Sequence, residues 1–132
     1  MEFVQFYPTA SGKAGARLRL YEGLIFRAGA RLKNAKGEDI LSKHGLNDPG
    51  KLTRDRLARA IMEEIEKGLG VEGGVIMDLG GIPGEWTATL SSILPAGWSP
   101  AVKEIVISPT THFCMGGVVT DSEAATAMAG LF

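Results

Sequence analysis

The stretch TRDRLARAIMEEIEKGLG, from Thr53 to Gly70, predicts the main helix of the chain. Leu57, Ile61 and Ile65 recur every four residues, so they form one apolar stripe along a helix face. Thr53 is a suitable N-cap, because its hydroxyl can accept a hydrogen bond from a free backbone N–H of the first turn. The glycines at the far end are typical of helix stops. We therefore expect an amphipathic helix that begins after Thr53.

Shorter alternating or apolar runs on both sides of this helix predict strands. The expected strands cover residues 2–7, 17–21, 73–81 and 103–108, and residues 30–41 suggest a hairpin. Pro8 is expected to end the first strand, and residues 84–94 to form a second, weaker helix. Because strands and helices mix without a strand–helix–strand rhythm, the predicted fold class is α+β, a small mixed sheet with a few helices.

Length, charge and cysteine count limit the kind of protein. With 132 residues, 45% of them hydrophobic, the chain is expected to form one domain, residues 1–132. The net charge of −1 gives no sign of a nucleic-acid or anionic-membrane partner. The single cysteine, Cys114, excludes an internal disulfide and suits a reducing compartment, so a cytoplasmic location is predicted. No apolar run reaches the ~18 residues that span a bilayer, so any membrane association would come through partner subunits.

The stretch SPTTHFCMGGVVTD, from Ser108 to Asp121, is the best candidate for a functional site. His112 follows the predicted strand end, where side chains often face a cleft, and an imidazole there can hold a carboxylate. The alternative is an ordinary loop histidine bonded to backbone, which the residue pattern alone favours. Met115, Gly116 and Gly117 permit the close approach of a flat cofactor, or they form a simple turn.

Other polar residues give weaker signals. Arg54 lies in the first turn of the main helix, where it is either a surface charge or a side chain that projects past the helix start into a cleft. Cys114 has no second cysteine or histidine at ligand spacing, so no metal site is expected. His44 lies in a polar stretch and is expected to be solvated. No GxGxxG or GxxxxGK[ST] loop occurs, so no phosphate cradle is predicted.

Four blocks of the sequence resemble one protein family. MEFVQFYPT, TRDRLARAI, SPTTHFCMGGVVTD and the closing GLF are similar, in the same order, to MEFxQFHPT, xRDxxARAI, xPxxHYxMGGxxTD and GLYAxGE. These are blocks of the succinate dehydrogenase/fumarate reductase flavoprotein family, which also includes L-aspartate oxidase. The resemblance implies that residues 1–132 are its capping domain, a substrate lid inserted into a larger FAD-dependent oxidoreductase of electron transport. The abrupt ends fit a segment of a longer chain, and the segment alone is expected neither to hold FAD nor to be active.

The resemblance also implies roles for individual residues. The chemistry would be hydride transfer between flavin and a dicarboxylate or related substrate, with Arg54 as the proton shuttle and His112 holding a substrate carboxylate. Tyr7 stands where the family has a substrate histidine. Met115, Gly116 and Gly117 would lie near the flavin, which the FAD-binding domain of the same chain holds.

The segment YEGLIFRAGA can be matched to the family block TEGxRGEG in two ways. Matching EG places Tyr21 at the substrate threonine and Glu22 at the acid of the proton relay. Matching RAGA keeps Arg27 but places Gly23 and Leu24 at those two positions. Two other functions stay open: a non-catalytic relative that serves as a binding or interaction module, and a free-standing small protein.

Overall fold

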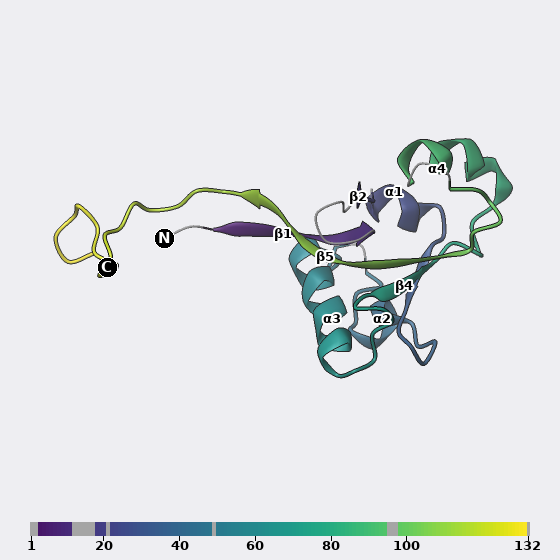
Figure 1. The fold of residues 1–132 in the computed structure, drawn as a ribbon, viewed down its shortest axis with the longest axis horizontal. Helices are drawn as coiled ribbons and strands as arrows, with labels where there is room; N and C mark the ends of the chain where they lie inside the picture. The colour runs from purple at the N-terminus through teal and green to yellow at the C-terminus, as the bar shows by residue number, and fades with distance from the viewer. Residues whose placement is uncertain (1–2, 12–17, 21, 49, 95–97, 132) are drawn as a thin grey trace.

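The computed structural model describes residues 3–11, 18–20, 22–48, 50–94 and 98–131, which form one five-stranded sheet with helices around it (Figure 1). The strand order is β2-β1-β5-β4-β3. The strands are β1 Val4–Ser11, β2 Leu18–Arg19, β3 Arg31–Lys33, β4 Val75–Asp78 and β5 Glu104–Cys114. The α+β prediction is confirmed. Each described strand pair is antiparallel, so the sheet is antiparallel rather than mixed.

Helix α3, Arg54–Glu66, is the predicted main helix and packs against β1 and β5. Thr53 caps it, with its Oγ1 accepting a hydrogen bond from the backbone N–H of Arg56 at 3.4 Å. Leu57 and Ile61 are buried in the core, and Ile65 packs against it. The other helical segments are α1 Glu22–Arg27, α2 Ile40–Lys43, η1 Gly84–Trp86 and α4 Thr87–Ile93. The second predicted helix is therefore confirmed as η1 and α4. No described helix is long and apolar enough to cross a membrane.

Strands β1 and β5 are longer than the sequence indicated. Pro8 does not end β1, because it lies at a register shift where Pro8 and Thr9 stand opposite the single residue Pro109. A proline at such a bulge removes no ladder hydrogen bond. Strand β5 likewise continues through Pro109 to Cys114, so the stretch around His112 is a strand and not a loop.

The hairpin expected over residues 30–41 is wrong in its second half. Strand β3 ends at Lys33, and Ile40 begins helix α2. Asp39 decides this, because its Oδ1 accepts a hydrogen bond from the backbone N–H of Ser42 at 2.8 Å and caps the helix. Helix α1, which contains the EG pair of the YEGLIFRAGA segment, was not predicted at all.

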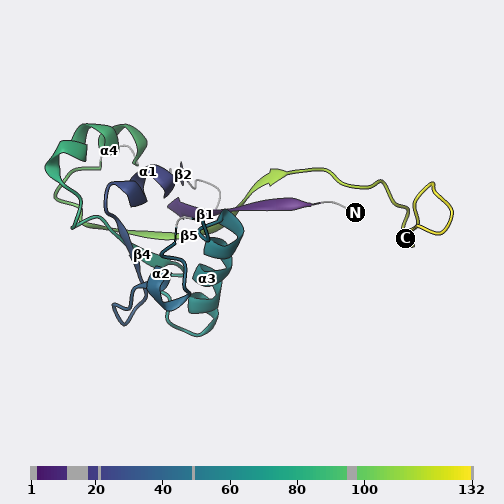
Figure 2. The ribbon, with the colours of Figure 1, turned by 180° about the vertical axis from the view of Figure 1, so that it is seen from behind.

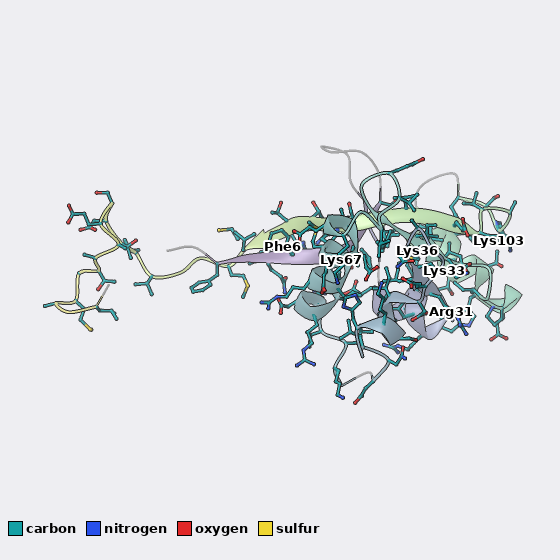
Figure 3. The ribbon with its side chains drawn as sticks, turned by 90° about the horizontal axis from the view of Figure 1, so that it is seen from below. Phe6, Arg31, Lys33, Lys36, Lys67 and Lys103 are labelled. Carbon is teal, nitrogen blue, oxygen red and sulfur yellow. The ribbon has the colours of Figure 1, made fainter. Side chains whose placement is uncertain are left out.

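The start of β1 and the end of β5 extend away from the body of the molecule and form an arm, residues 3–6 and 113–119 (Figures 1 and 2). The two segments of the arm stay paired beyond the ends of β1 and β5, since the Phe3 N–H donates to the Gly116 oxygen at 2.8 Å. Figure 3 shows Phe6 on the side of the arm and Arg31 near the opposite sheet edge. The arm carries these exposed large apolar side chains: Phe3, Val4, Phe6, Phe113, Met115, Val118 and Val119.

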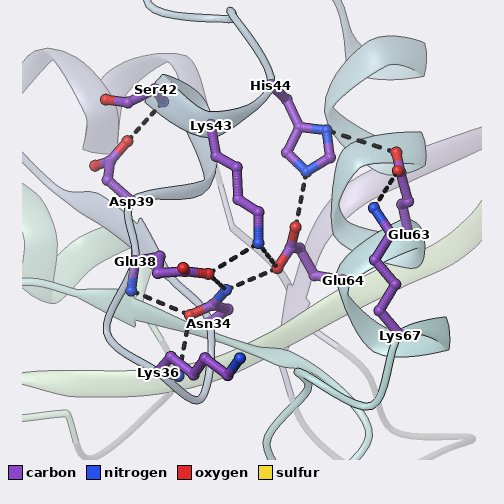
Figure 4. A network of polar contacts seen from close by, with 10 residues as sticks. All are labelled: Asn34, Lys36, Glu38, Asp39, Ser42, Lys43, His44, Glu63, Glu64 and Lys67. Carbon is purple, nitrogen blue, oxygen red and sulfur yellow. Dashed lines mark hydrogen bonds and ion pairs between the residues drawn. The ribbon is translucent and has the colours of Figure 1, made fainter.

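A buried polar network around Glu64 joins α2 and the β3 turn to α3 (Figure 4). The fully buried Glu64 carboxylate accepts hydrogen bonds from Asn34 Nδ2 at 2.7 Å, His44 Nε2 at 2.9 Å and Lys43 Nζ at 3.1 Å. Burial alone would raise the pKa of the Glu64 carboxyl, but the three donors outweigh it and lower that pKa to about 2. The expectation that His44 is solvated is wrong, because its ring turns inward to this carboxylate.

Gly74, directly before β4, lies close to the backbone of β5, which gives a test of the fold. An added Cβ at Gly74 would overlap the backbone oxygen of Ile107, so Gly74→Ala forces the two backbones apart. We expect a loss of about 1–3 kcal/mol in the free energy of unfolding, measured by urea denaturation. Gly84→Ala is the matched control, since its Cβ would meet nothing within 4 Å. Equal effects of the two substitutions would contradict the predicted approach.

Candidate functional site

A cavity of about 390 Å³ opens where β1, β2, β5, α3 and α4 meet. These described residues line it: Tyr7, Arg19, Arg54, Ser92, Ile93, Leu94 and His112. The two residues that the sequence singled out most strongly, Arg54 and His112, thus lie on one cavity although they are far apart in the chain. Each comes from a rigid element, because Arg54 begins α3 and His112 lies within β5.

The Arg54 guanidinium is held by Glu22, the first residue of α1. Arg54 Nε donates to Glu22 Oε1 at 2.7 Å, and the Arg54 Cζ lies 4.9 Å from the centre of the Tyr7 ring. This hydrogen bond from Arg54 to Glu22 raises the pKa of Arg54, so the guanidinium is charged in this arrangement. The second carboxylate oxygen, Glu22 Oε2, is buried and accepts no hydrogen bond from the described residues.

Tyr7 forms a wall of the cavity. Its side chain is buried, and its hydroxyl donates to the backbone oxygen of Leu20 at 2.9 Å. Burial, followed by the nearby Glu22 carboxylate, raises the pKa of Tyr7 well above its ordinary value. The Tyr7 hydroxyl proton is therefore already bonded to the Leu20 oxygen. Tyr7 lines the cavity with its ring. Thr9 Oγ1 donates to the same Leu20 oxygen at 2.8 Å, so this carbonyl is fixed from two sides.

His112 contacts an arginine that sequence reasoning missed. The Nη1 nitrogen of Arg19 lies 2.7 Å from His112 Nδ1 and 3.2 Å from Nε2. A guanidinium has only donors, so the ring nitrogen accepts and the imidazole is neutral in this contact. The His112 ring also packs edge-on against Tyr7, with centroids 5.2 Å apart. No motif marked Arg19, because the alternation of residues 17–21 indicated only a strand.

The remaining predicted residues lie around this cavity or outside it. Tyr21 falls outside the described residues. Glu22 contacts Arg54, and both residues line a neighbouring hollow of about 450 Å³ together with Gly23, Leu24 and Arg27. Arg27 Nε turns back to the Gly23 oxygen at 3.3 Å within α1.

Met115, Gly116 and Gly117 lie on the arm and do not line the His112 cavity. Met115 instead borders a groove of about 530 Å³, which it shares with Arg54, Phe6 and other residues of β1 and α3. Gly116 has φ +75°, a backbone conformation that favours glycine. Cys114 is exposed, and the part of the chain that the structure describes contains no group of three His, Cys, Asp or Glu residues placed to hold a metal.

Residues 1–132, the whole chain, match the family described as FAD binding domain. The chain belongs to this family. It is 34% identical over 137 residues to an uncharacterized FAD-dependent oxidoreductase of Methanocaldococcus jannaschii, covering 100% of this chain and 25% of the relative. It is 36% identical over 141 residues to one of the subunits of fumarate reductase (CoM/CoB) from Methanothermobacter marburgensis, again covering 100% and 25%. An L-aspartate oxidase of Mesorhizobium japonicum is 34% identical over 135 residues, with 100% of this chain and 26% of that protein covered.

The fold of this family member also matches solved structures. A quinol-fumarate reductase with menaquinol molecules superposes with a TM-score of 0.64 at 29% identity, covering 100% of this chain and 26% of that one. The chain therefore spans about a quarter of the length of the relatives it matches. The resemblance to fumarate reductase and L-aspartate oxidase flavoproteins is confirmed.

Proposed function

We propose that residues 1–132 are the capping domain, the substrate lid, of an FAD-dependent oxidoreductase that acts on a dicarboxylate or a related carboxylate. The observation that carries this proposal is the shared cavity of Arg54 and His112, with Glu22 bound to Arg54 on its flank. An arginine, an acid and a histidine at one small cavity suit a reaction that combines binding of an anion with movement of a proton.

The residues of this chain fit the substrate side of such a site and not the dinucleotide side. In the described part, no strand leads through a glycine-rich loop into a helix that could cradle a pyrophosphate. The FAD would therefore be held by the FAD-binding domain of the same parent protein. When bound there, the flavin supplies the hydride chemistry. We place Met115, Gly116 and Gly117 near it, because they lie exposed on the arm beside the groove that Arg54 also lines.

Arg54 is the proposed proton shuttle. Its Nε is held by Glu22, and its terminal nitrogens make no hydrogen bond within the described residues, so they are available to the cavity. A guanidinium hardly ever releases a proton, and Glu22 raises the pKa of Arg54 further. A proton that leaves a terminal nitrogen must therefore be replaced. Glu22 contacts Arg54 as a carboxylate, so it must first take up a proton itself before it can pass one to the guanidinium. The buried, unpartnered Oε2 is the second position at which this relay acid could hold a proton.

His112 is the proposed binding residue for a substrate carboxylate. One ring nitrogen accepts from Arg19, and the other can carry the ring proton and donate it to a carboxylate oxygen. Tyr7 stands where the family has a histidine, so at this position the cavity is lined by an uncharged ring. Tyr21, which precedes Glu22, stays a predicted substrate residue.

Flavin content of the full-length parent protein tests the proposal. Purified parent protein is expected to carry flavin, visible in its absorbance spectrum, and a dicarboxylate is expected to change that spectrum. The 132-residue segment alone is expected to retain none after gel filtration. A colourless parent protein would contradict the oxidoreductase proposal. Flavin retained at one equivalent by the segment alone would contradict its assignment as a lid.

A further inference from the structure

We propose that Arg19 is a specificity-determining residue, which binds the carboxylate group of a small organic acid at the His112 end of the cavity. The proposal concerns binding at the site described above and rests on the proposed function only for the statement that this acid is the substrate. Arg19 lies outside the motif blocks that carry the family resemblance, and the cavity itself points to it.

The charges of the cavity are unevenly compensated. Arg54 has a carboxylate partner in Glu22, so its charge is balanced inside the protein. Arg19 pairs with no carboxylate in the described ranges, and its side-chain contacts there are the neutral His112 ring and the face of Tyr7. The His112 end of the cavity therefore carries one free positive charge, while the Glu22 end carries none.

The two arginines lie close enough together in the cavity to favour the binding of an anion there. Both guanidinium groups lie near one ring, with the Cζ of Arg19 at 5.8 Å and that of Arg54 at 4.9 Å from the Tyr7 centroid. The ring face attracts both cations, but like charges in one cavity repel each other and an anionic ligand would reduce this repulsion. A carboxylate is the anion whose two oxygens match the planar fork of a guanidinium.

The contact between Arg19 and His112 holds a guanidinium and an imidazole, both possible hydrogen-bond donors to a ligand, at the same end of the cavity. Arg19 uses Nη1 toward the imidazole, and its other nitrogens make no hydrogen bond to the described residues, so they can bind a ligand. The ring nitrogen of His112 that does not accept from Arg19 can carry a proton and donate it. A carboxylate at this end can accept from Arg19 and from His112 together. The remainder of the acid would then extend along Ile93 and Leu94 toward Arg54. The ligand is thus oriented with its anionic end at Arg19 and its reacting carbon near Arg54.

Binding of malonate to the full-length parent protein tests this inference by calorimetry. Malonate has a single carbon between its carboxylates, so it cannot be dehydrogenated to an alkene and reports binding alone. Arg19→Gln is expected to raise the Kd for malonate about 10- to 100-fold, the usual effect of removing one charge-assisted contact. Arg19→Lys is expected to recover part of the affinity, because it keeps the charge but loses the fork.

Arg56→Gln is the matched control, since Arg56 is exposed on α3 and does not line the cavity. It is expected to leave the Kd for malonate unchanged within about twofold, the limit set by ordinary surface substitutions. Malonamide, which has the same skeleton without charge, should not distinguish wild type from Arg19→Gln. In turnover assays Arg19→Gln should raise KM far more than it lowers kcat, which a purely structural role would not produce.

Unchanged malonate affinity in a folded Arg19→Gln protein would overturn the inference, and so would a wild-type protein that does not bind malonate at all. The proposed function fails separately, on the flavin content of the parent protein. Malonate binding that depends on Arg19 in a flavin-free protein would support Arg19 as a carboxylate-binding residue and reject the oxidoreductase proposal.

Discussion

Arg54→Gln is expected to lower kcat of the full-length flavoprotein by about 10²- to 10⁴-fold, the usual contribution of a positioned acid or base. Glutamine keeps a polar side chain at the start of α3 but cannot carry or pass on a proton. It also leaves Glu22, whose Oε1 now accepts from Arg54 Nε at 2.7 Å, without its cation. Flavin content should be unchanged, because Arg54 binds the substrate side of the site. Stopped-flow measurement of flavin oxidation by substrate gives the rate of the step directly.

Arg56→Gln is the matched control for this substitution. Arg56 lies on the same helix, is exposed, and lines neither the His112 cavity nor the groove that Arg54 shares with Met115. We expect its kcat to equal that of wild type. Glu22→Gln should also lower kcat, because it removes the acid of the relay. The glutamine oxygen can still accept a hydrogen bond from Arg54, so the position of Arg54 should be kept. An unchanged rate in Arg54→Gln would remove Arg54 from the mechanism.

Glu64→Ala is expected to lower the free energy of unfolding by about 3–5 kcal/mol, because it breaks a buried ionic network by removing one side. The loss leaves Lys43, His44 and Asn34 without the carboxylate on which all three converge. Domains of this kind are stable by only about 5–15 kcal/mol, so the change is a large share of the total. Denaturant unfolding at pH 7 measures it.

The neighbouring Glu63 supplies the control. It is half exposed and pairs with Lys67 on the helix surface and with His44 Nδ1 at 3.6 Å (Figure 4), so Glu63→Ala should cost much less than Glu64→Ala. If the two alanine variants were equally stable, the network around Glu64 would not contribute in the way its geometry indicates.

The same network predicts a dependence of stability on pH. The Glu64 carboxyl has a pKa of about 2 in the folded protein, against an ordinary value of 4.5. A lowered pKa contributes stability that is fully present above the ordinary value and is lost as pH falls toward the folded value. The stability difference between wild type and Glu64→Gln should therefore be constant above about pH 5.5 and shrink as pH falls from 4.5 toward 2. A difference that stayed constant through this range would contradict the assignment.

Helix α3 could be predicted from the sequence because its signals are local. The apolar stripe, the Thr53 cap and the glycines at its end all lie within one segment, and each acts on the helix itself. Strand β5 could not be bounded in the same way. The residues around Pro109 have loop composition, and they become strand only because β1 pairs with them and a bulge takes up the two prolines.

The residues of the site differ in the same way in how far the sequence could predict them. Arg54 and His112 could be proposed because each lies in a block that resembles a known family, but their common cavity is a property of the folded chain. Arg19 and the inward turn of His44 had no such signal. Both depend on partners that are distant in the sequence, namely His112 for Arg19 and Glu64 for His44.

The Leu20 carbonyl oxygen, which accepts two hydrogen bonds, lies between the residues at the two ends of the cavity. Tyr7 and Thr9 both donate to it, and the Leu20 N–H donates in return to the Thr9 oxygen at 2.8 Å. Arg19 and Glu22 lie on either side of this anchored residue, one reaching His112 and the other Arg54. Ligand recognition and proton supply thus share the attachment of Leu20 to β1, and a displacement of that peptide would alter both together.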